Sequence, residues 1–233
     1  MPTVIVFDLF HTLISPEDFW PTGFSRERAA AEVLGIDAAS LAAFWDGDGR
    51  SRYTGRPVVE LLQEAVHLQD MEVTDEALVA ALEVYGRYHD RALETPRADV
   101  ITGLGTLRDA GCRLALLSNA DDREVAAWPK APLSKLVPTA CFSYEMGLAK
   151  PDPGAYRTIL GHLDADPQSA VFVGDGGSQE FEGARAAGIG TIVCVTGFGT
   201  SDGLRTRQSI RKAEALADTT VVSVAELPNV LSV

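Results

Sequence analysis

The stretch Val4-Ile-Val-Phe-Asp8-Leu-Phe-His-Thr-Leu13 decides how this chain folds, because four apolar residues run directly into an aspartate. A short continuous apolar run is typical of a strand that is covered on both faces, as strands are in parallel sheets. We expect the strand to end near Asp8, and ligands bind at the carboxyl ends of strands in open α/β sheets. A carboxylate buried there is costly unless it is paired, bound to a metal or used in chemistry. Asp8 is therefore a candidate functional residue; the alternative is a helix cap or a turn residue.

The residues that follow this strand have a helical pattern. In the segment 75–93, apolar residues recur at spacings of three and four, as one face of a helix requires. Helices are predicted at 26–34, 38–45, 58–68 and 75–93. Because no convincing strand interrupts these helices, residues 16–94 are predicted to form an inserted α-helical cap subdomain over the strand ends.

From residue 95 onward, the pattern changes to strands that alternate with helices. Apolar runs predict strands at 113–119, 140–144, 170–175, 191–195 and 220–224. Helices between them are predicted at 99–110, 153–163 and 181–187. Strand–helix units of this length imply a doubly wound parallel sheet with right-handed crossovers. The predicted fold is therefore a Rossmann-like α/β core of residues 1–15 and 95–233, interrupted by the helical cap.

The composition limits the classes of function. The net charge of −13 argues against indiscriminate binding to nucleic acid or to anionic membranes. No apolar run approaches the roughly 20 residues of a membrane span, and no signal-peptide pattern opens the chain. The cysteines Cys112, Cys141 and Cys194 are far apart, which favours buried thiols in a reducing cytoplasm over disulfides or zinc sites. We therefore expect a cytoplasmic protein that acts on a small molecule, as a monomer or a homodimer.

Polar residues stand at the ends of separate predicted strands in four short motifs. The motifs are Phe-Asp8-Leu-Phe10-His-Thr12-Leu, Leu-Leu-Ser118-Asn119, Ala-Lys150-Pro-Asp-Pro and Val-Gly-Asp175-Gly-Gly-Ser-Gln-Glu180. Their order and spacing resemble those of the haloacid dehalogenase (HAD) superfamily of hydrolases, and the resemblance covers the whole predicted core. Each motif alone is weak, but four in register are a strong signal. The segment 16–94 resembles the small cap that the family carries after its first motif.

The resemblance implies a catalytic role for these polar residues. Asp8 would be the nucleophile that forms a covalent aspartyl intermediate. Ser118 or Thr12, together with Lys150, would hold the oxyanion, and Lys150 would also keep the nucleophile ionised. Asn119 shares the motif of Ser118 and is counted with the catalytic residues. The alternative is that Ser118 and Asn119 only form a strand-ending turn and that Lys150 is a solvated loop residue.

The resemblance also implies a magnesium site. The carboxylates of Asp8 and Asp175 and the backbone carbonyl of Phe10 would bind Mg²⁺, which prefers hard oxygen ligands. Glu180 follows Asp175 by five positions, where the family usually has a second aspartate. Its longer side chain would reach the metal directly, reach it through water, or support Lys150. The alternative is an ordinary acid in the first turn of a helix.

Phe10 departs from the pattern of the family's phosphatases, which carry at this position the aspartate that protonates the leaving oxygen. A general acid is typically worth about 10²–10⁴ in rate. Either another acid replaces this aspartate, or the leaving group needs no proton, as with an acyl phosphate. His11 has a pKa suited to the missing role. The alternative is that His11 packs or makes a turn contact.

Two other functions stay open beside the phosphatase. The family's 2-haloacid dehalogenases carry an aromatic residue at the position of Phe10, and Tyr156 also matches their pattern. These enzymes work without metal and lack an acid at the position of Asp175, which this chain keeps together with Glu180. A binding protein that has lost catalysis is less expected, because the nucleophile, the lysine and the acid are all present. The favoured prediction is a Mg²⁺-dependent small-molecule phosphatase.

The predicted cap contains the candidate residues for binding the substrate. Arg50, Arg52 and Arg56 lie in a glycine-rich stretch that can cross the cleft, and each guanidinium can bind a carboxylate or a phosphate. Trp45 and Tyr53 could stack on a ring. The alternative is that the two aromatic residues belong to the core of the cap and that the arginines face solvent. The expected substrate is a small anionic molecule.

Overall fold

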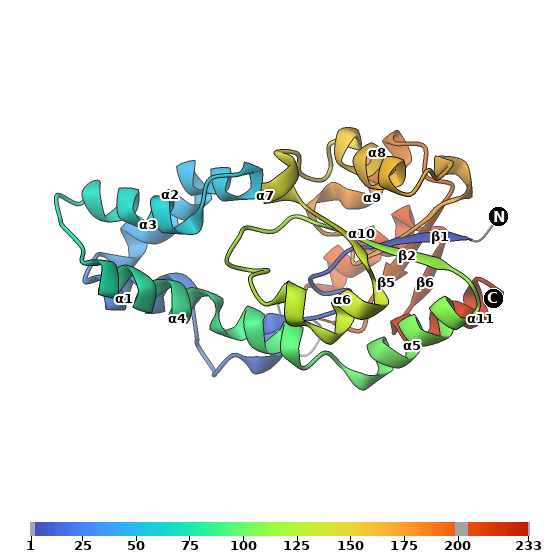
Figure 1. Cartoon of the computed structure of the whole chain (residues 1–233), viewed down its shortest axis with the longest axis horizontal. Helices are drawn as coiled ribbons and strands as arrows, with labels where there is room; N and C mark the ends of the chain where they lie inside the picture. The colour runs from blue at the N-terminus through green and yellow to red at the C-terminus, as the bar shows by residue number, and fades with distance from the viewer. Residues whose placement is uncertain (1–2, 199–204, 233) are drawn as a thin grey trace.

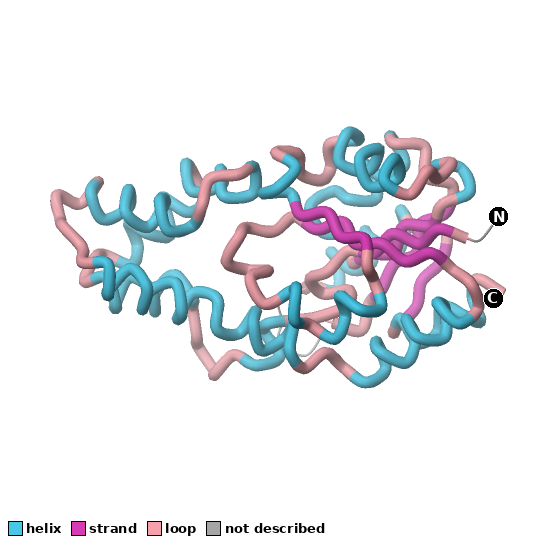
Figure 2. Tube along the Cα trace, in the orientation of Figure 1, coloured by secondary structure: helices cyan, strands magenta, loops and turns pink. Residues whose placement is uncertain are grey.

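Within the described residues, six parallel strands form the sheet that positions the functional side chains (Figure 2). The computed structural model describes residues 3–198 and 205–232. The strands are β1 (Val4–Phe7), β2 (Arg113–Ser118), β3 (Thr139–Phe142), β4 (Val171–Gly174), β5 (Thr191–Val195) and β6 (Thr219–Val221). Their order in the sheet is β3-β2-β1-β4-β5-β6. The predicted α/β fold with a doubly wound parallel sheet is confirmed.

Helices cover both faces of this sheet (Figure 1). They are α5 (Ala98–Asp109), α6 (Pro132–Leu136), α8 (Pro153–His162), α9 (Glu180–Ala186), α10 (Arg207–Leu216) and α11 (Leu227–Val230). Ile5 and Phe7 share a hydrophobic cluster with α5, α6 and α11, whereas Val4 and Val6 share one with α8, α9 and α10. Successive side chains of a strand point to opposite faces, so a strand covered twice is apolar at every position.

Residues 16–94, all of which the structure describes, contain helices and no strand. These are η1 (Pro16–Phe19), α1 (Arg26–Leu34), α2 (Ala38–Asp46), η2 (Asp48–Thr54), α3 (Val58–His67) and α4 (Asp75–Glu94). The Ser25 side chain caps the start of α1, and Gly35 ends it with a φ of 69°. The helices pack around a cluster of their own that includes Leu61 and Tyr85. We call residues 16–94 the helical block; it lies opposite the chain termini in Figure 1.

The structure differs from the predicted elements in a few segments. The glycine-rich stretch after Trp45 is the 3-10 helix η2, since Arg52 Nη1 donates to the carbonyls of Gly49 at 2.9 Å and Trp45 at 3.1 Å. β3 ends at residue 142 rather than 144, because the short helix α7 (Ser143–Met146) begins there. β6 likewise ends earlier than predicted, and α10 was not predicted. The remaining 3-10 helices are η3 (Trp128–Lys130), η4 (Pro167–Ser169), η5 (Gly177–Gln179) and η6 (Val224–Glu226).

The structure also bears on two expectations from composition. Cys112, Cys141 and Cys194 are free and buried, as expected of thiols that form no disulfide. Among the helices that the structure describes, none is both long and apolar enough to cross a membrane. The cytoplasmic location stays a prediction.

Candidate active site

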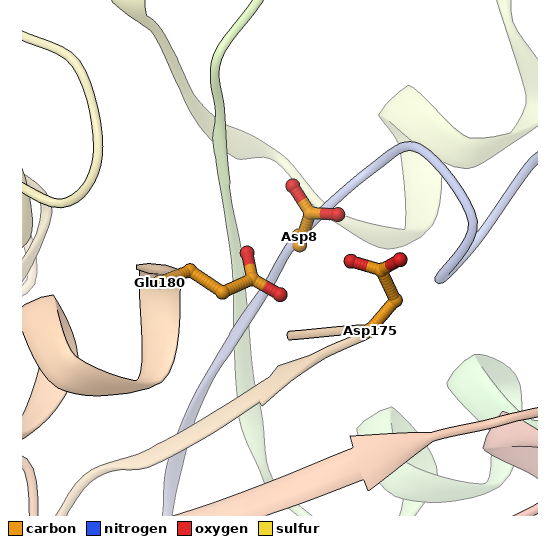
Figure 3. A group of neighbouring side chains, drawn as sticks. All are labelled: Asp8, Asp175 and Glu180. Atoms are coloured by element: carbon orange, nitrogen blue, oxygen red, sulfur yellow. The ribbon is translucent and has the colours of Figure 1, made fainter. Parts of the chain in front are cut away.

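The strand order brings three carboxylates to one edge of the sheet. Asp8 follows β1, and its backbone N–H donates to the carbonyl of Val173 in β4 at 2.8 Å. Asp175 follows β4, and Glu180 is the first residue of α9. One carboxylate oxygen of each of these acids lies within 4.8 Å of the others, and all three residues are buried (Figure 3). The order of strands reverses between β1 and β4, which is where open α/β sheets bind ligands.

Lys150 places a positive charge between two of these carboxylates. Its Nζ donates to Asp8 Oδ1 at 2.5 Å and to Glu180 Oε2 at 2.6 Å, and the lysine side chain is only 2% exposed. Burial alone would lower the pKa of Lys150, but the two carboxylates raise this pKa above its ordinary value. The lysine is therefore protonated, and its charge favours the ionised form of Asp8 that a nucleophile needs.

The carboxylates of this edge repel one another. Burial raises the pKa of Glu180 to about 8, and the charges of Asp8 and Asp175 add to the effect while Lys150 opposes it. Burial also raises the pKa of Asp8, again with Lys150 opposing and Asp175 adding. A cation among these oxygens would favour the ionised forms and remove the repulsion. The arrangement therefore suits a site that binds a positive ion.

The backbone after β4 allows Glu180 to reach this edge. Ser178 and Gln179 adopt left-handed conformations with φ of 51° and 54°, which direct the chain into α9. Gly174 has no side chain, and a Cβ at this position would overlap the Glu180 carboxylate. The Oε1 atom of that carboxylate accepts a hydrogen bond from the backbone N–H of Gly176 at 2.8 Å. Because its other oxygen holds the lysine, Glu180 is placed to support Lys150, one of the roles expected for it.

Asp175 is held by two groups, one of which the sequence analysis missed. Its Oδ1 accepts a hydrogen bond from the backbone N–H of Gly177 at 2.8 Å. The Nε of Arg205 lies 3.5 Å from Asp175 Oδ2, and the same guanidinium donates to the Asp175 backbone carbonyl. Arg205 comes 30 residues later in the chain, outside any motif, so no spacing could have identified it.

The polar residues of the first two motifs have different surroundings. Thr12 Oγ1 donates to Asp8 Oδ2 at 3.3 Å. Ser118 is fully buried, and its Oγ has no hydrogen-bond partner among the described residues, so this hydroxyl is free to hold a ligand oxygen. The Asn119 side chain donates to the Lys150 carbonyl at 2.8 Å and accepts from the Lys150 N–H at 2.7 Å. Asn119 therefore fixes the backbone of the lysine.

The side chains of Phe10 and His11 contact different residues. The Phe10 ring packs edge-on against the ring of His89, with 5.5 Å between centroids. His11 Nε2 lies 3.1 Å from Glu17 Oε2. Burial lowers the pKa of His11, but the hydrogen bond and charge of Glu17 raise this pKa overall. Burial would raise the pKa of Glu17, yet His11 lowers it to about 2. The two side chains thus form a charged pair, and the nearby charge of Asp8 adds to the rise in the pKa of His11.

A pocket of about 600 Å³ lies between η2 and the core. It is lined by four of the five predicted substrate-binding residues, Trp45, Arg50, Arg52 and Tyr53, opposite Asn119 and Lys150. Arg52 is buried and holds η2 together. The Arg50 side chain is exposed and forms no ion pair or hydrogen bond with a described residue, whereas its backbone N–H donates to the carbonyl of Gly47 at 3.1 Å. Arg56 is not part of this lining, since it pairs with Glu64 at 2.8 Å.

A second group of buried charges was not predicted. Arg26 of α1 donates to Glu124 of the loop after β2 at 2.6 Å, and Arg52 Nε lies 3.5 Å from Asp121 in the same loop. His89 of α4 belongs to the same group, since its Nε2 lies 3.3 Å from Arg26 Nη1. Arg26 and Glu124 are 98 positions apart, so no local pattern connects them.

Comparison with known proteins reveals relatives in two classes of hydrolase. The chain is 27% identical over 205 residues to the phosphoglycolate phosphatase of Pseudomonas putida, covering 85% of this chain and 71% of that protein. It is 26% identical over 198 residues to (S)-2-haloacid dehalogenase 4A of Burkholderia cepacia, covering 80% of each. The solved 2-haloacid dehalogenase of Pseudomonas syringae pv. tomato DC3000 shares the fold, with a TM-score of 0.65 at 24% identity over 100% of this chain and 99% of that one. Because the model of the haloacid dehalogenase-like hydrolases matches residues 2–188, the expected resemblance is confirmed and the chain belongs to this family of hydrolases.

Proposed function

We propose that this protein is a Mg²⁺-dependent phosphatase that acts on a small anionic phosphate compound through Asp8. The observation that carries the proposal is the group of three buried carboxylates whose oxygens lie within 4.8 Å of one another around Lys150. Buried negative charges at this density are unfavourable without a cation. The phosphoglycolate phosphatase of Pseudomonas putida among the relatives supports the same reaction class.

The donor atoms of the site fit magnesium. Asp8 and Asp175 would hold Mg²⁺, with the backbone carbonyl of Phe10 as a further oxygen and Glu180 at the same edge. Among the described residues, the cluster contains carboxylates and neither cysteine nor histidine, and hard oxygen donors favour Mg²⁺ over zinc. When bound, Mg²⁺ would supply positive charge that stabilises the oxygens of the transferring phosphoryl group.

Each side chain of the site would have its own role in the reaction. Asp8 attacks phosphorus, the ester P–O bond breaks, and the leaving alcohol takes a proton while the phosphoryl group stays on the aspartate. Water then attacks the acyl phosphate and releases inorganic phosphate and the free carboxylate. Ser118 donates its unpartnered hydroxyl to a phosphoryl oxygen, and Lys150 stabilises the negative charge. Asn119 keeps the lysine backbone in place.

His11 is the candidate donor of the leaving-group proton, because Phe10 cannot supply one. Its pairing with Glu17 at 3.1 Å raises the pKa of His11 and thus favours the protonated imidazole. A protonated imidazole next to the nucleophile is a suitable general acid. An acyl phosphate would not need this proton, because its leaving carboxylate is stable.

The organic part of the substrate would enter the pocket between η2 and the core. Of the two arginines that line this pocket, Arg50 is the one whose guanidinium has no partner among the described residues, so it is placed to bind an anionic group of the substrate. In this proposal, the helical block serves as a cap that selects the substrate. The expected cytoplasmic location, which the free buried cysteines support, and the monomeric or homodimeric state belong to the same proposal.

Dehalogenation of a 2-haloacid is the second candidate. Phe10 favours it, because a halide leaves without a proton and needs no general acid. Tyr156 is also buried beside the site, where its hydroxyl donates to the Glu180 carbonyl at 2.7 Å. The carboxylates of Asp175 and Glu180 favour the phosphatase, since they would hold a Mg²⁺ ion, which dehalogenation of a haloacid does not need.

The test measures two products with and without Mg²⁺. The phosphatase is supported by Mg²⁺-stimulated release of phosphate from p-nitrophenyl phosphate or acetyl phosphate, lost in Asp8→Asn. Metal-independent release of chloride from 2-chloropropionate, without phosphate release, would support the dehalogenase instead. If neither product forms across a panel of phosphorylated metabolites and haloacids, both proposals are wrong. His11→Ala should slow poor leaving groups far more than activated ones if His11 is the acid.

A further inference from the structure

Two carboxylates hold together a buried turn in the loop after β2. The backbone N–H groups of Arg123 and Glu124 donate to Asp121 Oδ1 at 3.0 and 2.8 Å. The backbone N–H of Asp121 donates in return to Glu124 Oε2 at 3.1 Å. Asp121 is fully buried and Glu124 is 3% exposed. These reciprocal bonds fix the turn, which directly follows Ser118 and Asn119.

The other oxygen of each carboxylate reaches the helical block. Asp121 Oδ2 accepts a hydrogen bond from the Tyr85 hydroxyl at 3.0 Å and lies 3.5 Å from Arg52 Nε. Glu124 Oε1 accepts a hydrogen bond from Arg26 Nη1 at 2.6 Å. Each carboxylate therefore uses one oxygen for the turn and the other for the helical block.

The two residues inside the turn contact the helical block as well. Asp122 Oδ1 accepts a hydrogen bond from the backbone N–H of Val58, the first residue of α3, at 3.0 Å. Arg123 donates to both carboxylate oxygens of Asp90 in α4, at 2.8 and 2.5 Å. Its guanidinium lies against Gly86, where any side chain would overlap it. One turn of the core thus contacts α1, α3, α4 and η2.

We propose that Asp121 and Glu124 are positioning residues that set the place of the helical block relative to Ser118 and Asn119. The substrate pocket has η2 on one side and Asn119 with Lys150 on the other, so this placement determines its width. The kinetic part of this inference rests on the proposed function. The placement itself is measurable without any substrate.

The charge balance explains why both carboxylates are needed. Two acids and two arginines neutralise each other in a place where water is excluded, and removing one partner leaves the opposite charge buried and unpaired. In Glu124→Gln, Arg26 would keep only Glu27, at 3.0 Å, as a charged partner within the helical block. Its guanidinium would then move toward solvent and carry the start of α1 away from the core.

The experiment places spin labels on the full chain and measures the distance between them by electron double resonance. Val79→Cys in α4 and Val222→Cys after β6 provide exposed label positions, 56% and 62% exposed, while the native cysteines are buried. Glu124→Gln and Asp121→Asn are expected to broaden or shift the distance distribution. With p-nitrophenyl phosphate, they are expected to raise KM about tenfold, with a smaller loss in kcat.

Two further variants serve as controls. Glu27→Gln removes a carboxylate from the same arginine but leaves the core turn intact, so the distance distribution should not change. Tyr85→Phe removes the hydrogen bond to Asp121, together with the one that the hydroxyl accepts from Trp45 Nε1 at 3.1 Å, and keeps every charge, so it should broaden the distribution less and decides the matter if the charge variants do not fold.

An unchanged distribution in the foldable variants would overturn the inference, and so would equal broadening in Glu27→Gln. A changed distribution in an enzyme that releases no phosphate would reject the proposed function alone.

Discussion

Two groups of buried charged residues lie at the carboxyl ends of the strands. They differ in the balance of acidic and basic side chains. At the sheet edge, three carboxylates face one lysine and, at 3.5 Å, one arginine: Asp8, Asp175, Glu180, Lys150 and Arg205. Between the helical block and the core, two carboxylates face two arginines: Asp121, Glu124, Arg26 and Arg52. With every acid ionised, the first five residues carry one net negative charge, whereas the second four are neutral; Glu27, whose side chain is 26% exposed, also pairs with Arg26 at the edge of the second group. We conclude that the unbalanced group suits a charged ligand and the balanced group suits a structural role.

The hydrogen bonds show the same difference. Both oxygens of Asp121 and both oxygens of Glu124 are occupied by groups of the protein. At the sheet edge, the Ser118 hydroxyl has no partner in the part of the chain that the structure describes. Burial raises the pKa of Asp121 to about 7, while Arg26 outweighs burial and lowers the pKa of Glu124. The two carboxylates of the second group are thus saturated by the protein, although Arg52 Nε beside them has no hydrogen-bond partner among the described residues.

The largest expected effect comes from Asp8→Asn, which removes the proposed nucleophile but keeps its size. Turnover of p-nitrophenyl phosphate should fall by about 10³-fold or more, because the amide cannot form the acyl phosphate proposed for Asp8. Glu182→Gln, an exposed acid of α9, is the matched control and should keep full activity. Substantial activity in Asp8→Asn would show that the excess charge at the sheet edge does not mark the catalytic site.

The charge pairs of the balanced group should contribute measurably to the free energy of unfolding. We expect Arg26→Gln and Glu124→Gln each to lower the free energy of unfolding by about 3 kcal/mol, since each leaves a buried charge unpaired. The double variant should lose about 1–3 kcal/mol less than the sum of the two, as measured by urea unfolding. Additive losses would mean that the two side chains do not act as a pair.

Binding of Mg²⁺ should distinguish the two charge groups, because only the group at the sheet edge is proposed to hold the ion. At a concentration about 100-fold above its Kd, Mg²⁺ should stabilise the protein by about 2.7 kcal/mol, or roughly 5–10 °C in Tm for a chain of this size. Asp175→Asn should abolish this shift in calorimetry, whereas Asp121→Asn should keep it. A shift that survives in Asp175→Asn would place the cation elsewhere.

The pair of His11 and Glu17 at the rim of the site should have the smallest effect, visible in the pH dependence of stability. The pKa of Glu17 is lowered to about 2, so its stabilising contribution is present above pH 4.5 and is lost as the pH falls toward 2. The pKa of His11 is raised, so its contribution is present below pH 6.5 and is lost above that range.

The measurement compares the wild type with Glu17→Gln by thermal unfolding across this range. Near pH 6 the variant should be less stable by about 1–2 kcal/mol after solvent screening, and the difference should shrink on acidification. A difference that stays constant with pH would contradict the charged pair.

Much of the fold could be predicted because its strands are apolar at every position and its helices begin and end at recognisable residues. Val4 to Phe7 are buried on both faces, and such strands have an unmistakable composition. Four short motifs located Asp8, Ser118, Lys150 and Asp175; three of these residues follow or end a strand of this kind, whereas Lys150 lies in the loop after α7. The roles of these residues stay proposals.

The rest could not be predicted because it depends on distant contacts. Arg205, Asp121 and Glu124 acquire their partners only when segments 30 to 98 positions apart meet. Arg52 looked like a candidate substrate ligand, yet most of its guanidinium contacts lie within the helical block. A sequence pattern identifies the kind of charge that a residue carries, whereas the fold determines whether that charge is already satisfied.

The close approach of the Glu180 carboxylate to the α-carbon of Gly174 has an evolutionary consequence. A methyl group there would collide with this carboxylate, which is held by Lys150 and by the N–H of Gly176, so a change at one position affects the other. A descendant that acquires alanine at 174 has to shorten the acid at 180, and a shorter acid would release the lysine. We therefore expect these two sites to covary among homologues, and the glycine to persist wherever the long acid does.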